Sequence, residues 1–74
     1  MYAVIIIDGE KIAIRSQLSS VEFFDAIPVD LLGLLFEGNP FAAVVIKTID
    51  PSLRFSRDPA VIAAIERESE LANN

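Results

Sequence analysis

The residue types that most enzymes use for catalysis are almost missing from this chain. It contains no histidine and no cysteine, whereas most general-base and nucleophile schemes use His, Cys, or a Ser or Lys beside a base. The serines fall mostly at expected loops and helix caps. Lys47 lies in an apolar run, but a lysine whose ammonium reaches solvent is the simpler interpretation. We therefore expect a protein that is not an enzyme.

An anion site is the one constellation with a plausible ligand chemistry. Arg54 and Arg57 flank Phe55-Ser56 just before an expected helix start, and both guanidinium groups and helix N-termini favour phosphate or carboxylate. Against this, Asp50 and Asp58 flank the segment with the opposite charge, and the arginines can pair locally. The formal net charge of −5 and the small basic patch argue against a nucleic-acid partner.

Metal binding has little support in the positions of the acidic residues. Asp8 and Glu10 flank a turn, but no run of oxygen ligands has the fixed offsets of a calcium loop. Asp8 is explained by an Asp-Gly turn and Asp58 by a helix cap. We expect no metal and no cofactor.

A leucine-rich segment is the strongest candidate for a binding surface. Over Asp30–Gly38 the apolar side chains of an expected helix sweep an arc of roughly 200°, whereas one core needs a stripe only about 100° wide. Either the rest of the chain or a partner must cover the second side. The candidate partner interface is Leu31, Leu32, Gly33, Leu34, Leu35 and Phe36, rimmed by Asp30 and Glu37.

Gly33 is the least expected residue in that segment. Glycine inside a helix costs about 1 kcal/mol relative to alanine, so its presence needs a reason. Close approach of another backbone would supply one, and that backbone could belong to this chain or to a partner.

Composition also points towards association. A chain of 74 residues buries only around 60% of the surface that its unfolded form exposes. Without cysteine or histidine it has neither disulfides nor the usual structural zinc site. Its apolar content of 53% is high for so small a domain, which favours self-association or a dedicated partner.

The elements begin with a β-hairpin. The β-branched run of residues 2–7 reads as a central strand covered on both faces. Asp8-Gly9 is a hairpin turn. The following strand, residues 11–15, alternates so that Ile12 and Ile14 face inward.

Two short helices are expected next. Ser19-Ser20-Val21-Glu22 is a capping box, and the helix after it should bury Val21, Phe23, Phe24 and Ile27. Pro28 ends this helix, and Asp30 caps the leucine-rich one.

A third strand, residues 41–49, a loop and a final helix complete the chain. Asp58 caps that helix with Pro59 at its first position, and residues 71–74 are expected to fray. The sequence thus predicts one α+β domain, residues 1–74, in the order β-β-α-α-β-α. Its three-stranded sheet has residues 2–7 in the middle and helices packed on it.

Two functional hypotheses follow. The first is a non-enzymatic protein–protein interaction or regulatory module, a homodimer or partner-binding domain that uses the leucine-rich helix. The alternative is an anion- or nucleic-acid-binding domain that uses the basic loop and strand. The acidic stretch of residues 19–38 adds a weaker third hypothesis, a mimic of nucleic acid. No uncharged run reaches the 18 residues of a membrane span, and the cytoplasm is the default location.

Overall fold

The chain begins with an antiparallel β-hairpin. In the computed structural model, which describes the backbone of residues 1–72 and the side chains of residues 1–68, β1 (Tyr2–Ile7) pairs with β2 (Glu10–Arg15). Asp8 and Gly9 form the turn with φ angles of 51° and 78°. Two successive positive φ angles are the requirement of a type I′ turn, so the predicted hairpin is confirmed.

The third strand comes from the segment that the sequence predicted as a loop. β3 (Arg54–Ser56) pairs antiparallel with β2, and Phe55 lies opposite Ile14. The sheet order is β1-β2-β3. The predicted α+β class with a three-stranded sheet is confirmed, but β2 is the middle strand and β1 is an edge strand.

The position of β1 at the edge is visible in the exposure of its side chains. Ala3, Ile5 and Ile7 pack against the core. On the other face Tyr2 is 60% exposed and Ile6 is 68% exposed. The continuous apolar run therefore does not reflect cover on both faces within this chain.

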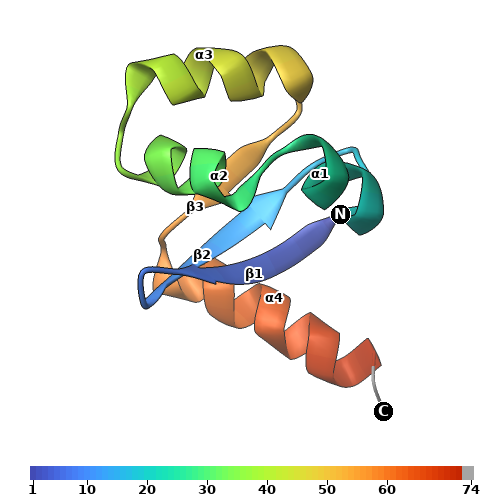
Figure 1. Ribbon diagram of the computed structural model, residues 1–74. Helices are drawn as coiled ribbons and strands as arrows, with labels where there is room; N and C mark the ends of the chain where they lie inside the picture. The colour runs from blue at the N-terminus through green and yellow to red at the C-terminus, as the bar shows by residue number, and fades with distance from the viewer. Residues whose placement is uncertain (73–74) are drawn as a thin grey trace.

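Helices cover the two faces of the sheet unequally. Three helices, α1 (Ser20–Ala26), α2 (Val29–Phe36) and α3 (Pro40–Ile49), lie on one side of the sheet, and α4 (Pro59–Ala72) lies on the other side (Figure 1). The order is thus β-β-α-α-α-β-α, with one helix more than the sequence predicted.

The additional helix replaces the predicted strand of residues 41–49. Asn39 caps it by accepting hydrogen bonds from the backbone N–H groups of Phe41 and Ala42, and Pro40 occupies its first turn. Ala42 and Ile46 are buried and Val45 is half-buried, which is helical spacing. The cap and this spacing override the strand preference of the β-branched residues.

The first two helices differ from expectation in detail. The capping box of Ser19 and Glu22 is present. Phe23 and Ile27 are fully buried, but Val21 and Phe24 are 80% and 43% exposed, because a helix of seven residues presents only one side to the sheet. Pro28, not Asp30, is the N-cap residue of α2 and makes no side-chain cap bond.

The core lies between β2 and the three helices on its side. As the alternation predicted, Ile12 and Ile14 point into it, and they meet Phe23, Leu32 and other buried side chains. On the opposite face of β2, Ala13 is buried where α4 packs on the sheet. Lys11 on that face pairs with Glu66 of α4 at 3.1 Å.

The final helix starts as the sequence predicted. Asp58 accepts a hydrogen bond from the N–H of Ala60 at 2.9 Å, and Pro59 is the first helical residue. Of the residues predicted to fray, 71 and 72 belong to α4, and 73–74 lie outside the described residues. No helix among residues 1–72 is long and apolar enough to cross a bilayer.

Candidate functional site

The residues of the leucine-rich helix separate into an inner and an outer set. Leu32 is fully buried and Phe36 is 7% exposed, and Leu31 and Leu35 are partly buried against the core. Much of the second apolar side is covered by α3, which packs on α2. Of the six candidate interface residues, only Leu34 is exposed, at 42%, and Gly33 is half-buried.

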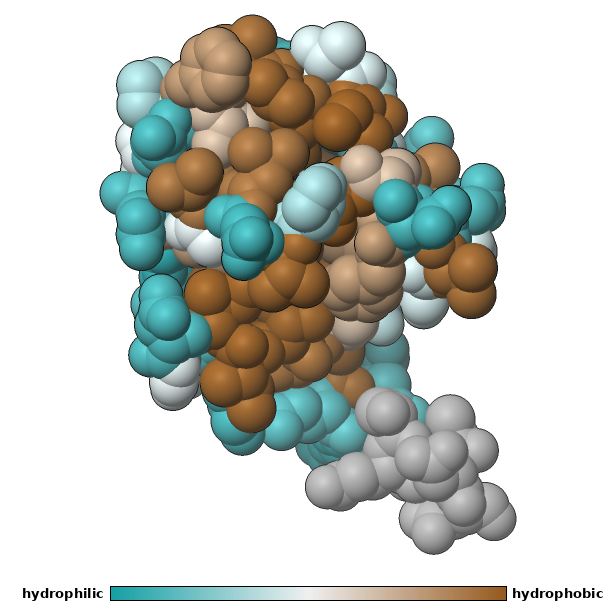
Figure 2. Space-filling view, in the orientation of Figure 1, coloured by the Kyte–Doolittle hydropathy of each residue, from teal (hydrophilic) through white to brown (hydrophobic). Residues whose placement is uncertain are grey.

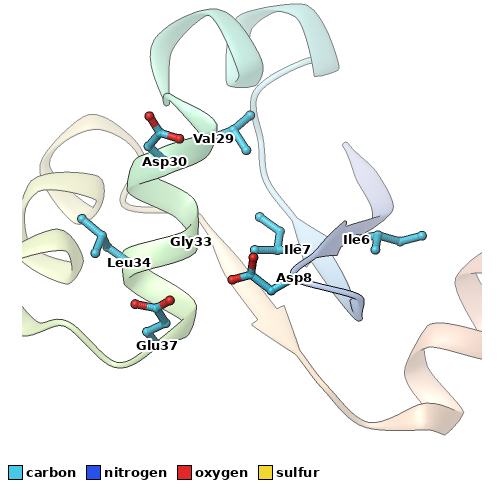
Figure 3. A pocket seen from close by; sticks show the side chains of 8 residues that line it. All are labelled: Ile6, Ile7, Asp8, Val29, Asp30, Gly33, Leu34 and Glu37. Atoms are coloured by element: carbon cyan, nitrogen blue, oxygen red, sulfur yellow. The ribbon is translucent and has the colours of Figure 1, made fainter.

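Gly33 and Leu34 line a groove between α2 and the end of the hairpin. The groove has a volume of about 480 Å³, and its lining residues are Ile6, Ile7, Asp8, Val29, Asp30, Gly33, Leu34 and Glu37. Figure 3 shows Ile7 and Asp8 projecting from the hairpin towards α2, while Ile6 points to the other face of the sheet. The lining combines apolar residues with three acidic ones, Asp8, Asp30 and Glu37.

Gly33 is not explained by a close contact within the chain. A Cβ atom at this position would meet only Cγ2 of Ile7 among the described residues, at an ordinary distance of 3.9 Å. The predicted close approach of a backbone from this chain is therefore wrong for the described residues. The version with a partner's backbone stays a prediction.

Beside the groove, the outer edge of β1 pairs with no other strand in the part of the chain that the structure describes. Met1 and Ser16 exchange two hydrogen bonds, with N···O distances of 2.9 and 2.5 Å, so they form a hydrogen-bonded pair. Because such pairs alternate along an antiparallel ladder, Ala3, Ile5 and Ile7 bond to β2. The backbone N–H and C=O groups of the alternate residues, Tyr2, Val4 and Ile6, therefore point away from β2.

The side chains along this edge are apolar. Residues 2–7 contain no charge and no proline. Hydrophobic side chains cover much of the face shown in Figure 2, with a few hydrophilic side chains between them. Sequence reasoning missed this edge because it placed β1 in the centre of the sheet. The sheet order could not be read from the local pattern.

The two candidate anion-site arginines do not converge on one point. Arg57 pairs with Glu10 at 2.7 Å and also donates to the carbonyl of Phe36. Arg54 donates to the carbonyls of Pro51 and Leu53 at 3.2 and 2.8 Å. Their guanidinium groups thus serve local structure, as the simpler interpretation of the sequence had it.

A second basic pair lies on the sheet itself. Arg54 is directly opposite Arg15 in the β2–β3 ladder, and Arg15 lies over the ring of Tyr2 at 5.3 Å. These three residues contribute to a cavity of about 220 Å³ beside α4. Like charges directly opposite each other are unfavourable, so this is where an anion would relieve repulsion.

The buried polar groups form one satisfied cluster. Asp50 is 3% exposed and accepts hydrogen bonds from the hydroxyl groups of Ser16 and Ser52, each at 2.5 Å. Burial acts to raise the pKa of Asp50, but the hydrogen bonds from Ser16, Ser52 and the backbone outweigh it and hold that pKa below its usual value. The cluster joins the end of β2 to the C-terminus of α3.

The chemistry available in this cluster is limited. A serine nucleophile needs an adjacent base that can accept its proton, and Asp50, with its lowered pKa, is a weak base. Among the described residues no buried side-chain polar atom lacks a partner. No group of three potential metal ligands occurs in the part of the chain that the structure describes.

Neither a protein-family model, nor a curated protein, nor a solved structure matches this chain.

Proposed function

We propose that this chain is a non-enzymatic protein–protein interaction module that binds its partner along the free edge of β1 and the adjoining groove. One observation carries the proposal: among the described residues, the outer N–H and C=O groups of a six-residue, uncharged edge strand pair with no other strand, and they lie beside a groove. Such an edge is a template for pairing with another strand.

The absence of protective features on β1 supports this proposal. Edge strands are normally short, bulged, covered, or marked by proline or inward-pointing charge. β1 pairs with β2 residue for residue from Tyr2 to Ile7, without a bulge. By contrast, β3 at the other edge has only three residues and begins with Arg54. In β-augmentation the backbone supplies affinity and adjacent pockets supply specificity, and the groove would serve as such a pocket.

The proposal moves the interface from the leucine-rich helix to the hairpin. Of the helix, Gly33 and Leu34 contribute to the groove. The acidic lining residues Asp8, Asp30 and Glu37 would disfavour acidic partners. Two expectations from the sequence stay predictions: that the protein is not an enzyme, and that it is located in the cytoplasm.

A variant that blocks only the outer edge tests the proposal. Val4→Pro removes a backbone N–H that points away from β2. Because proline is tolerated in an edge strand where its missing N–H faces solvent, the hydrogen bonds between β1 and β2 should remain. A random peptide library would be selected against the wild-type protein and against this variant. Peptides enriched on the wild type alone would support the proposal.

Two results would contradict it. Equal enrichment on Val4→Pro would mean that the peptides bind elsewhere. The proposal also fails if no peptide is enriched and the protein does not self-associate at any concentration. Val44→Lys, on the exposed side of α3, is the control for a substitution that leaves β1 unchanged.

Anion binding is the second candidate, favoured by the opposed pair of Arg15 and Arg54. It predicts that binding to a mixed RNA and DNA pool weakens with salt and is lost in Arg54→Ala. Arg57→Ala, which removes the arginine paired with Glu10, would leave that binding largely unchanged. No salt-dependent binding would exclude this candidate.

A further inference from the structure

β1 has the composition of a central strand but the position of an edge strand. Its run of Tyr-Ala-Val-Ile-Ile-Ile is typical of a strand inside a sheet with both faces covered, yet Tyr2 and Ile6 are exposed. Among the described residues, only β2 pairs with this strand. This mismatch disappears if another strand joins the free edge. The sequence of β1 itself offers a strand of matching length and character.

We infer that the partner on this edge is β1 of a second copy of the chain, paired antiparallel about a two-fold axis through Val4. This inference rests on the proposed function and specifies its partner. It produces a continuous sheet in which β1 of both copies is central, because two sheets of three strands join at their β1 edges.

The hydrogen-bonding groups are complementary in this register. A two-fold axis perpendicular to the sheet places Val4 opposite Val4 and Tyr2 opposite Ile6 of the second copy. All of these residues have outward-pointing N–H and C=O groups. Each hydrogen-bonded pair exchanges two bonds, so three pairs use every outward backbone group of residues 2–6.

The side chains are complementary as well. Tyr2 and Ile6 lie on the face of the sheet that α4 covers, and they are 60% and 68% exposed. In the paired sheet each Tyr2 ring lies beside Ile6 of the other copy, and aromatic pairs with β-branched residues stabilise antiparallel strands. Ala3 meets Ile5 on the opposite face, where both already pack against the core.

Charge does not oppose this arrangement. Residues 2–7 carry none, so no like charges lie opposite each other across the axis. Asp8 and the acidic lining residues Asp30 and Glu37 lie at the turn end of β1. Antiparallel pairing puts the acidic ends of the two copies at opposite ends of the joined strands. A parallel arrangement would bring them together.

The area indicates a weak, reversible dimer. An aromatic side chain buries about 150–250 Å², so the exposed parts of Tyr2 and Ile6 in both copies contribute on the order of 400 Å². Stable interfaces bury about 1,200–2,000 Å² in total. Even when the buried backbone area is added, an interface of one strand pair lies towards the lower end of the range of interface areas. We therefore expect a dimer that dissociates on dilution.

Sedimentation equilibrium from ~1 µM to ~1 mM protein, the range expected for a small interface, tests the inference. The wild type should pass from monomer to dimer, and Val4→Pro should stay monomeric with an unchanged circular dichroism spectrum. Val44→Lys, which alters the exposed face of α3, should dimerise like the wild type.

The register has its own test because the chain has no cysteine. Val4→Cys places two thiols opposite each other across the axis, at a Cα separation of about 5.5 Å that a disulfide can span. It should form a covalent dimer under mild oxidation. Tyr2→Cys alone should not, whereas a mixture of Tyr2→Cys and Ile6→Cys proteins should form the mixed disulfide.

The outcomes separate this inference from the proposed function. A wild-type protein that is monomeric at all concentrations but binds peptides along β1 would overturn self-pairing and leave the proposed function standing. Dimerisation that survives Val4→Pro but is lost in Val44→Lys would place the interface on α3 and overturn the inference. Crosslinking of Ile5→Cys in place of Val4→Cys would overturn the stated register.

Discussion

At the scale of single residues, Gly33 and Asp50 show opposite relations between sequence and structure. Gly33 was singled out by its helix-breaking character, and the structure places it in the groove. The local sequence places Asp50 in a loop, and its burial could not be predicted because its hydroxyl partner Ser16 lies 34 positions away. A local sequence pattern can identify a residue that is unfavourable in its own helix, such as Gly33. It cannot identify a buried hydrogen-bond partner that is distant in the sequence.

Replacing Gly33 with alanine should stabilise the fold. The new Cβ meets Ile7 at an ordinary 3.9 Å, and alanine in a helix is favoured by about 1 kcal/mol. For a domain of this size the midpoint of thermal unfolding should rise by about 4–8 °C. Gly9→Ala is the contrasting control, because φ is +78° at that residue and a side chain there is strained. A lower midpoint for Gly33→Ala would contradict this account of the site.

Removing the hydroxyl of Ser16 should reveal the role of Asp50. Hydrogen bonds to a charged group contribute about 1.5–3 kcal/mol, so Ser16→Ala should lose roughly that much of the free energy of unfolding at neutral pH. Exposed Ser20→Ala should change it by less than about 0.5 kcal/mol.

The pH dependence has a definite sign. Because the pKa of Asp50 is lowered in the folded state, its contribution is present above the carboxyl's unfolded pKa of about 3.9. It is lost as the pH falls through the folded value. The difference between wild type and Ser16→Ala, measured by denaturant unfolding, should therefore shrink in acid. A difference that stays constant down to pH ~2 would mean that the ionised carboxylate is not what Ser16 stabilises.

At the scale of elements, caps and turns were more informative than residue preferences. The Asp8-Gly9 turn, the capping box at Ser19 and the start of α4 at Asp58 are all present. The main error concerned residues 41–49, where the β-branched side chains predicted a strand and the helix start at Asn39-Pro40 was not recognised. Strand preference reflects packing on a sheet surface, so it carries little weight where no sheet is available.

The Asn39 cap should therefore matter to α3. Asn39→Ala removes the acceptor for two backbone N–H groups and should cost about 1 kcal/mol, seen as a lower thermal midpoint. Asn39→Asp retains the acceptor and should keep most of the stability. If both variants unfold at the wild-type temperature, the cap does not hold this helix.

At the scale of the whole molecule, the sheet order was beyond the reach of the sequence. The run of residues 2–7 indicates a central strand covered on both faces, but it does not say whether its neighbours belong to one chain. The predicted site was accordingly placed on the leucine-rich helix, most of which α3 and the core cover. A high apolar content predicts that part of the surface is apolar, but only the tertiary structure shows which element that surface belongs to.

A charge on the β1 edge should reduce association without loss of the fold. Ile6→Glu places a carboxylate opposite Lys11 in the ladder, which is a favourable cross-strand pair. The solubility limit should rise while the free energy of unfolding stays within about 0.5 kcal/mol. Val21→Glu, at a residue 80% exposed on α1, adds the same charge away from the edge. An equal gain in solubility from both variants would attribute the effect to net charge alone.

The central place of β2 also has a consequence for synthesis on the ribosome. The hairpin and the first three helices can assemble from neighbours along the chain, but the second edge of β2 is closed by residues 54–56 and its other face by α4. Until those residues emerge, the nascent sheet exposes strand edges and apolar surface, the features that make folding intermediates prone to aggregate. The period before β3 and α4 have joined the sheet is therefore the one in which the folding chain is most prone to aggregate.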